Sequence, residues 1–326
     1  MKKPIFVCIA LCFSLQLFSQ VTEPEGKLKE RSTDTVSGWQ TGGVTSLTFS
    51  QTSLTNWAAG GENSLSVNGL FSVYADYKSD ENSWDNSLDI GYGLLGTGEN
   101  SLDYKKTDDK IDFLSKYGRR ASNKLYYAAL FNFKTQMTNG YDYSSDSDLP
   151  VSTYLAPAYV TTAIGIDYKP ISDLSCFFAP VTSRVTLVTL QRLANQGEYG
   201  VEPATYDDMG NMIEEGETYR SEFGGYIRVI YSKNDFEPTW LENVSLTSKI
   251  DLFSNYVEEP QNIDVNWQNQ LAFKVNKYLN VTFNTHLIYD DDITIGEDTN
   301  GDGEHDSFSP RVQFKQILGV GFSFSF

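Results

Sequence analysis

The last sixteen residues of the chain, RVQFKQILGVGFSFSF (311–326), alternate between two kinds of side chain. One face is apolar except for Gln316 and carries Val312, Phe314, Leu318, Val320, Phe322, Phe324 and Phe326. The other face is polar or small except for Ile317. A period of two residues predicts a β-strand with one apolar face, longer than the roughly five or six residues usual in a soluble protein.

The same alternation recurs along the chain after residue 42. About twelve segments show it, near 43–51, 63–79, 84–97, 108–118, 124–137, 158–169, 174–191, 220–233, 244–257, 262–276, 279–292 and 311–326. Long connections follow the third, fifth, seventh and eleventh segments, and short ones follow the even segments. This arrangement predicts an all-β fold, an antiparallel transmembrane β-barrel of about twelve strands with short periplasmic turns and long acidic extracellular loops. A soluble sandwich with an aromatic last strand is the alternative.

The first twenty residues, MKKPIFVCIALCFSLQLFSQ, have the pattern of a secretory signal peptide. Two lysines precede a largely apolar stretch, Ile5 to Phe18, that is too short to span a bilayer as a helix. We therefore expect a signal peptide over 1–20, a polar periplasmic leader over 21–41 and the barrel over 42–326. Cys176 is then the one cysteine of the exported chain, which excludes an internal disulfide framework.

The net charge of −18 excludes nucleic acid as a partner, because phosphates require a basic surface. Export and strand pattern together place the protein in the outer membrane of a Gram-negative cell. Its expected partners are outer-membrane lipid and lipopolysaccharide, and the barrel-insertion machinery through a C-terminal signal ending at Phe326. The sequence does not determine the oligomeric state. Trp84, Trp240 and Trp267 lie near strand ends, as is typical of aromatic girdles.

Several segments of the chain resemble a family of exported Bacteroidota proteins, domain-of-unknown-function family 3078. These segments are SQTSLTNWAAGGENS (50–64), KLYYAALFNFKTQMTNGYD (124–142), LAPAYVTTAIGIDYKP (155–170), APVTSRVTLV (179–188), VNWQNQLAFKVNKYL (265–279) and the last sixteen residues. The resemblance implies an outer-membrane or periplasm-facing β-barrel. It implies no catalytic or ligand-binding residues.

The loop GEDTNGDGEHDSF (296–308) has oxygen-bearing side chains at alternate positions around a glycine. The candidate calcium ligands are Asp298, Asn300, Asp302, Glu304 and Asp306. Alternating oxygen ligands with a glycine at the bend are the pattern of calcium loops, although Ser309 occupies the position of the bidentate acid of an EF-hand. The alternative is a solvated acidic turn. Calcium is the one cofactor that the sequence suggests.

Alternation directs many charged side chains into the barrel. Expected to face the lumen are Asp89, Asp112, Lys116, Lys134, Asp167, Arg184, Glu222, Arg228, Lys249, Asp251, Lys274, His286, Asp290, Arg311 and Lys315. The solute-contacting candidates among them are Arg184, Arg228, Lys274, His286 and Asp290. Structural ion pairing is the other role open to Arg184 and Arg228. A barrel of twelve strands falls between the filled barrels of about eight and the open channels of sixteen or more.

These features predict an outer-membrane barrel that is a narrow channel or a binding protein for small solutes, hence porin-like and active in transport. A structural envelope barrel with an occluded lumen is the first alternative, and an outer-membrane hydrolase is the second. We expect no enzyme. No Gly-x-Ser-x-Gly motif occurs, and His286 and Asp290 are about 13 Å apart along a strand, too far for a hydrogen-bonded dyad.

Overall fold

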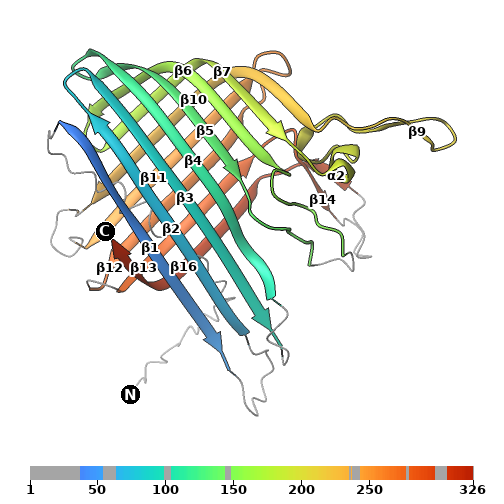
Figure 1. Cartoon of the computed structure of the whole chain (residues 1–326), viewed down its shortest axis with the longest axis horizontal. Coiled ribbons are helices and arrows are strands. Elements are labelled where there is room, and N and C mark those ends of the chain that lie inside the picture. The colour runs from blue at the N-terminus through green and yellow to red at the C-terminus, as the bar shows by residue number, and fades with distance from the viewer. Residues whose placement is uncertain are drawn as a thin grey trace, which may run out of the picture.

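The computed structural model describes residues 37–53, 64–98, 104–143, 148–234, 236, 243–276, 279–297 and 307–325. Its main feature is a closed barrel of antiparallel strands in the order β1-β16-β13-β12-β11-β10-β7-β6-β5-β4-β3-β2 (Figure 1). The strands are β1 (Gly38–Thr52), β2 (Ser64–Lys78), β3 (Asn82–Thr97), β4 (Tyr104–Ser122), β5 (Leu125–Thr135), β6 (Ala158–Ile171), β7 (Leu174–Leu187), β10 (Tyr219–Asn234), β11 (Val244–Asn255), β12 (Asp264–Lys274), β13 (Leu279–Tyr289) and β16 (Gln313–Ser325). The predicted fold class is confirmed.

The period of two residues explains which side chains line the interior. In β2, for example, Ser66, Asn68 and Ser72 are buried, whereas Phe71 between them is exposed. Large apolar side chains are exposed on the outer face of strand after strand, among them Phe49, Ile164, Phe178, Phe223, Phe283, Phe314 and Phe322. A polar interior within an apolar exterior is the arrangement of a barrel whose outer face meets lipid.

The long connections contain structure that alternation does not predict. The segment after β7 forms a short helix α2 (Gln191–Asn195), a 3-10 turn η1 (Glu198–Gly200) and the hairpin β8 (Thr205–Tyr206) with β9 (Met212–Glu214). The expected strand 174–191 therefore ends at Leu187, because the chain turns into α2. A second hairpin, β14 (Thr294–Glu297) with β15 (Ser307–Pro310), follows β13. No helix in the described part of the chain is long and apolar enough to cross a membrane.

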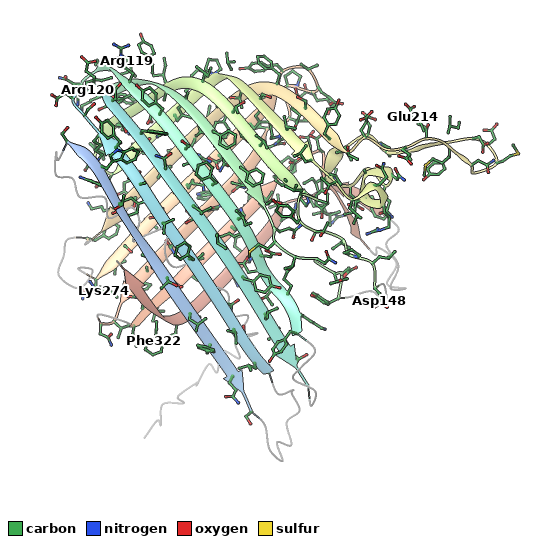
Figure 2. All side chains as sticks on the ribbon, viewed as in Figure 1. Arg119, Arg120, Asp148, Glu214, Lys274 and Phe322 are labelled. Atoms are coloured by element: carbon green, nitrogen blue, oxygen red, sulfur yellow. The ribbon has the colours of Figure 1, made fainter. Side chains whose placement is uncertain are left out.

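The two ends of the barrel differ in their connections. Tight turns join β2 to β3, β4 to β5 and β6 to β7 at one end, which we call the short-turn end. Figure 2 shows Arg119, Arg120 and Lys274 at that end, while Glu214 lies on the β8–β9 hairpin, which projects from the opposite, long-loop end. β1 begins at Gly38, before the expected barrel start at residue 42. The segment expected to be a signal peptide, most of the expected leader, the loop 298–306 and Phe326 lie outside the described residues.

A row of aromatic residues crosses four neighbouring strands near the short-turn end. The strand register aligns Trp39 with Tyr77, Tyr77 with Trp84, and Trp84 with Tyr117. The ring of Trp39 lies 5.5 Å from that of Tyr77 and 5.7 Å from that of Trp84, centroid to centroid. Amphipathic rings of this kind are enriched where a barrel wall meets the membrane–water interface.

The first and last strands of the ring, β1 and β16, share a short ladder of paired residues. β1 pairs with β2 over fifteen residue pairs, from Gly38↔Lys78 to Thr52↔Ser64. β1 pairs with β16 over four, from Val44↔Ser325 to Leu47↔Phe322. Beyond Leu47 the described residues of β1 and β16 form no further pairs, and the carboxyl end of β1 diverges from β16 in Figure 1.

Cysteine cross-linking tests the length of this seam. In a Cys176→Ser background, we expect Leu47→Cys with Phe322→Cys to form a disulfide readily, because paired strand residues lie within disulfide reach. We expect Phe49→Cys with Val320→Cys, two residues further along each strand, to form one much more slowly. Both pairs are exposed on the outer face, so reagent access is matched. Equal rates, followed by gel mobility after oxidation, would mean that the ladder continues.

Two strands approach each other closely at Gly165 of β6. A Cβ atom at this position would lie 2.0 Å from the carbonyl oxygen of Phe178 and 2.5 Å from the Cα of Ala179, and backbone atoms cannot rotate away. The β6–β7 register shifts at the same place, between Ile164 and Ile166. A residue without a side chain is therefore required for the two strands to pair here.

We expect Gly165→Ala to destabilise the barrel by about 1–3 kcal/mol, the usual cost of overpacking, or to prevent folding. Gly69→Ala in β2 is the matched control, because the nearest atom to its added Cβ is a leucine methyl at 3.9 Å. The measurement is urea unfolding in lipid vesicles, monitored by the difference in gel migration between heated and unheated samples. Equal midpoints for the two variants would contradict this explanation.

Candidate functional site

One half of the barrel interior is filled by apolar side chains. A buried cluster consists of Ala128, Leu130, Ala163, Phe177, Ala179, Tyr226 and Phe253, with Leu114 packed against it. These residues come from β4, β5, β6, β7, β10 and β11, which are consecutive around the ring. The edge of the Tyr226 ring meets Phe177 at 6.3 Å between centroids. This half of the lumen is therefore packed like the core of a small barrel.

A buried ion pair lies beside the apolar cluster. Arg228 of β10 and Asp251 of β11 occupy paired register positions. The guanidinium donates twice, Nε to Oδ1 at 2.6 Å and Nη2 to Oδ2 at 3.0 Å. Tyr226 donates its hydroxyl to the same Oδ1 at 2.8 Å. The carboxylate thus accepts from three donors, two of them from Arg228, so this arginine is held in a structural ion pair.

At the long-loop end, a network of arginines and carboxylates crosses the lumen. Arg184 of β7 donates to both carboxylate oxygens of Glu222, at 2.6 and 2.8 Å, and lies over the Phe253 ring at 4.4 Å. It also contacts Asp264 of β12, and Asp290 and Asp292 are each 3.8 Å away. We call this set, with Arg220 and Glu258, the Arg184 network.

Arg220 extends the network toward the loops. Its Nη1 lies 2.8 Å from Asp292 and its Nη2 3.0 Å from Glu258. The network thus contains two arginines and five carboxylates, Glu222, Glu258, Asp264, Asp290 and Asp292. Burial raises the pKa of the Asp290 carboxyl above its usual range, an effect that Arg184 opposes. Carboxylates outnumber guanidinium groups by five to two at this end of the lumen.

A third charged group narrows the lumen toward the short-turn end. Lys116 of β4 donates to Asp167 of β6 at 2.7 Å, across the intervening strand β5. Ser175 donates to the other oxygen of Asp167 at 2.7 Å, and Lys169 Nζ is 3.6 Å from the carboxylate. The side chains of both Lys116 and Asp167 are largely buried. These contacts therefore lie inside the barrel and occupy part of its lumen.

Between these ends, the half of the lumen that the apolar cluster leaves open contains a cavity of about 230 Å³, here called the central cavity. The residues that line it are polar except for Leu70 and Ile111, and they come from two facing walls. One wall, from β2 to β5, supplies Leu70, Asp89, Asp108, Lys110, Ile111, Asp112, Lys134 and Thr135. The other, from β11 to β16, supplies Thr247, Lys249, Asn266, Gln268, Asn269, Gln270, Asn284, Thr285, His286 and Lys315.

The solute-contacting candidates from the sequence occupy different places. Arg184 and Asp290 belong to the Arg184 network, Arg228 to the buried pair, and His286 lines the central cavity with its Nε2 3.0 Å from Asn266 Oδ1. Lys274 is exposed at the end of β12, at the short-turn end of the barrel (Figure 2).

The five candidate calcium ligands, Asp298, Asn300, Asp302, Glu304 and Asp306, lie outside the described residues. Among the residues that are described, no group of three or more His, Cys, Asp or Glu side chains is placed to hold a metal ion. Sequence reasoning missed Tyr226 and Phe253, although their inward positions follow from the same alternation that identified Arg228 and Asp251.

The family model of a protein of unknown function, DUF3078, matches residues 49–141, which include β2 to β5. The predicted resemblance is thus confirmed for this part of the chain. No curated protein sequence matches significantly.

Solved structures with similar folds are outer-membrane proteins. The COG4313 outer membrane channel from Pseudomonas putida F1 is 9% identical, with a TM-score of 0.39 over 90% of this chain and 97% of that one. The translocator domain of the autotransporter NalP from Neisseria meningitidis is 10% identical, with a TM-score of 0.32 over 92% and 94%. The CymD monoaromatic hydrocarbon channel is 10% identical, with a TM-score of 0.32 over 92% and 90%. The strand register, rather than this likeness, establishes the barrel.

Removing one member of the buried pair tests its structural role. We expect Arg228→Met to destabilise the barrel by about 3–5 kcal/mol, because Asp251 is left as an uncompensated buried charge. The double variant Arg228→Met with Asp251→Leu should recover most of the loss. Urea unfolding in lipid vesicles measures both, with Lys233→Met as a control away from the pair. A double variant as unstable as the single one would contradict this account.

Proposed function

We propose that the protein spans the outer membrane of a Gram-negative cell and is a narrow channel or binding protein for small polar solutes. The central cavity is the observation that carries this proposal. A cavity lined by polar residues from two facing walls, inside a barrel with an apolar exterior, offers a polar solute a place to bind within the membrane.

The outer surface supports the membrane assignment. Exposed apolar side chains encircle the barrel on strands of every part of the ring, including Leu47 on β1, Ile164 on β6, Phe223 on β10 and Phe283 on β13. A soluble monomer rarely exposes a continuous apolar surface of this extent, whereas lipid requires one. The aromatic row Trp39, Tyr77, Trp84 and Tyr117 supplies an interfacial girdle.

The orientation follows from the charge of the connections. Between Leu193 and Tyr219, the long segment after β7 contains seven acids and no lysine or arginine. We assign this acidic end to the cell exterior, where it interacts with divalent cations that bridge lipopolysaccharide. The tight turns at the other end would then face the periplasm, in keeping with the long outer loops and short inner turns of such barrels.

Passage through the lumen requires the charged closures to rearrange. The Arg184 network lies between the long-loop end and the central cavity, and Lys116 with Asp167 narrows the route to the short-turn end. Ion pairs can exchange partners for a solute or for water more readily than packed apolar side chains can move, so the route past them is the one we assign to solute. No catalytic role is proposed, since His286 is placed against Asn266 rather than a carboxylate.

A structural barrel with an occluded lumen is the second candidate. The apolar cluster around Phe177 and Tyr226 favours it, because this packing fills half of the interior and excludes water there. The two candidates differ in one measurable property, which is whether ions cross the barrel.

Single-channel recording of the refolded barrel in a planar bilayer distinguishes them. We expect a small conductance for the wild type and a larger, more cation-selective one for Arg184→Ala. The substitution removes the guanidinium that holds Glu222 and Asp264 across the lumen and leaves the carboxylates unneutralised. Lys233→Ala, on β10 outside the cavity lining and outside the Arg184 network, is the control and should conduct like the wild type. Absence of conductance in all three proteins would favour the structural barrel.

A further inference from the structure

We propose that the central cavity binds a small organic or inorganic anion, a carboxylate or a phosphate, and that Lys249 and Asn284 contact it. The inference rests on the proposed function and names the class of solute. It follows from the alignment of nitrogen-bearing side chains on one wall, from two buried groups without partners, and from the balance of charge in the cavity.

The strand register places four nitrogen-bearing side chains in one row across neighbouring strands. Lys249 of β11 pairs with Gln268 of β12, Gln268 pairs with His286 of β13, and His286 pairs with Lys315 of β16. All four line the central cavity. Because paired residues in a sheet have their side chains on the same face, the row presents its nitrogen atoms to a single volume.

Lys249 is buried, with 8% of its surface exposed, and within the described chain its ammonium group makes no direct ion pair or hydrogen bond. The carboxylate nearest to it along β11, Asp251, is already bonded by Arg228 and Tyr226. The neighbour of Lys249 in the register on the other side is Ile230, which offers no partner. An ammonium in a confined interior is costly unless an anion accompanies it. Lys249 therefore differs from Lys116, whose charge is matched by Asp167.

Asn284 of β13 supplies the second group. It is 5% exposed, lines the same cavity, and its side-chain Nδ2 has no hydrogen-bond partner. Asn284 pairs with Gln270 in the ladder, one row away from His286. A buried amide nitrogen without an acceptor costs free energy, and a ligand oxygen in the cavity would recover it.

The balance of charge favours an anion over a cation. The cavity lining contains four lysines and three aspartates. Each aspartate is already engaged: Ser72 donates to Asp89, Lys315 lies 3.6 Å from Asp108, and Asp112 accepts from Asn132 at 2.7 Å. Lys249 and Lys315 lie in the same row as His286, and Lys110 and Lys134 line the facing wall, so ammonium groups from both walls surround one volume.

The same lining sets limits on the ligand. A volume of about 230 Å³ admits a small solute only. Lysine and amide donors act as point donors and lack the planar fork with which arginine selects a carboxylate, so carboxylate and phosphate remain equivalent in this site.

Binding to the refolded barrel in detergent tests the proposal. The probes are inorganic phosphate and succinate, titrated calorimetrically against chloride at matched ionic strength. We expect at least one probe to bind the wild type, and Lys249→Gln to weaken it about tenfold or more, as for loss of a charge-assisted hydrogen bond. Asn284→Asp should weaken it as well, since it replaces a donor with a negative charge. Lys233→Gln, on β10 outside the cavity lining, should bind like the wild type.

Thermal unfolding provides a second readout. Without anion, Lys249→Gln should be at least as stable as the wild type, because it removes an uncompensated buried charge. Phosphate or succinate should raise the unfolding temperature of the wild type but not of the variant. Absence of binding to the wild type, or an affinity in both Lys249→Gln and Asn284→Asp that equals that of the wild type, overturns the proposal. Should Lys249→Gln not fold, Asn284→Asp alone decides.

The outcome is separable from that of the proposed function. If the barrel binds the anion but does not conduct in the planar bilayer, the proposal of a channel is wrong and the proposal of an anion site stands. Conductance without binding leaves the channel and shows the cavity to be filled by water alone. If phosphate binds and succinate does not, or the reverse, the ligand class narrows to one of the two.

Discussion

The structure depends on one constraint: a β-strand in lipid must satisfy its backbone N–H and C=O groups through neighbouring strands, on both sides and without an end. Twelve strands meet this requirement by closing into a ring. Among the described residues, β1 has fifteen pairs with β2 and four with β16. The described part of the seam, between Val44–Leu47 and Phe322–Ser325, is therefore short, and any lateral opening would begin there.

The strands could be predicted from sequence, and so could the side of the barrel wall that each side chain faces. Alternation determines whether a side chain points to the lumen or to lipid, and we call this its parity. Arg184, Arg228 and His286 lie inside as parity requires, and the outward face of β16 is apolar as expected. Parity does not determine depth or partners. Lys274 has the parity of a lumen residue but lies at the strand end. The contact between Arg184 and Asp264 joins residues 80 positions apart, and this depends on ring order, which no period reveals.

The interior combines two ways of filling a barrel of intermediate size. From β4 to β11, apolar side chains and the Arg228–Asp251 pair pack like a small barrel; from β11 round to β4, polar side chains leave the central cavity. The division matters physically. The packed half fixes the positions of the strands. The cavity half can therefore retain buried groups without a direct partner, such as Lys249 and Asn284, because the packing of the other half offsets the free energy that their burial costs.

The charges along the barrel also bear on the side from which an anion would reach the central cavity. The long-loop end is acidic, and the Arg184 network carries five carboxylates against two arginines, so an anion entering there meets repulsion. The short-turn end carries Arg119, Arg120 and Lys124. Its closure contains Lys116 and Lys169 against Asp167 and Asp85, so its charges balance and it repels an anion less than the Arg184 network does. If the cavity takes an anion, the field of the protein favours exchange through the short-turn end, and the Arg184 network acts as the barrier that retains it.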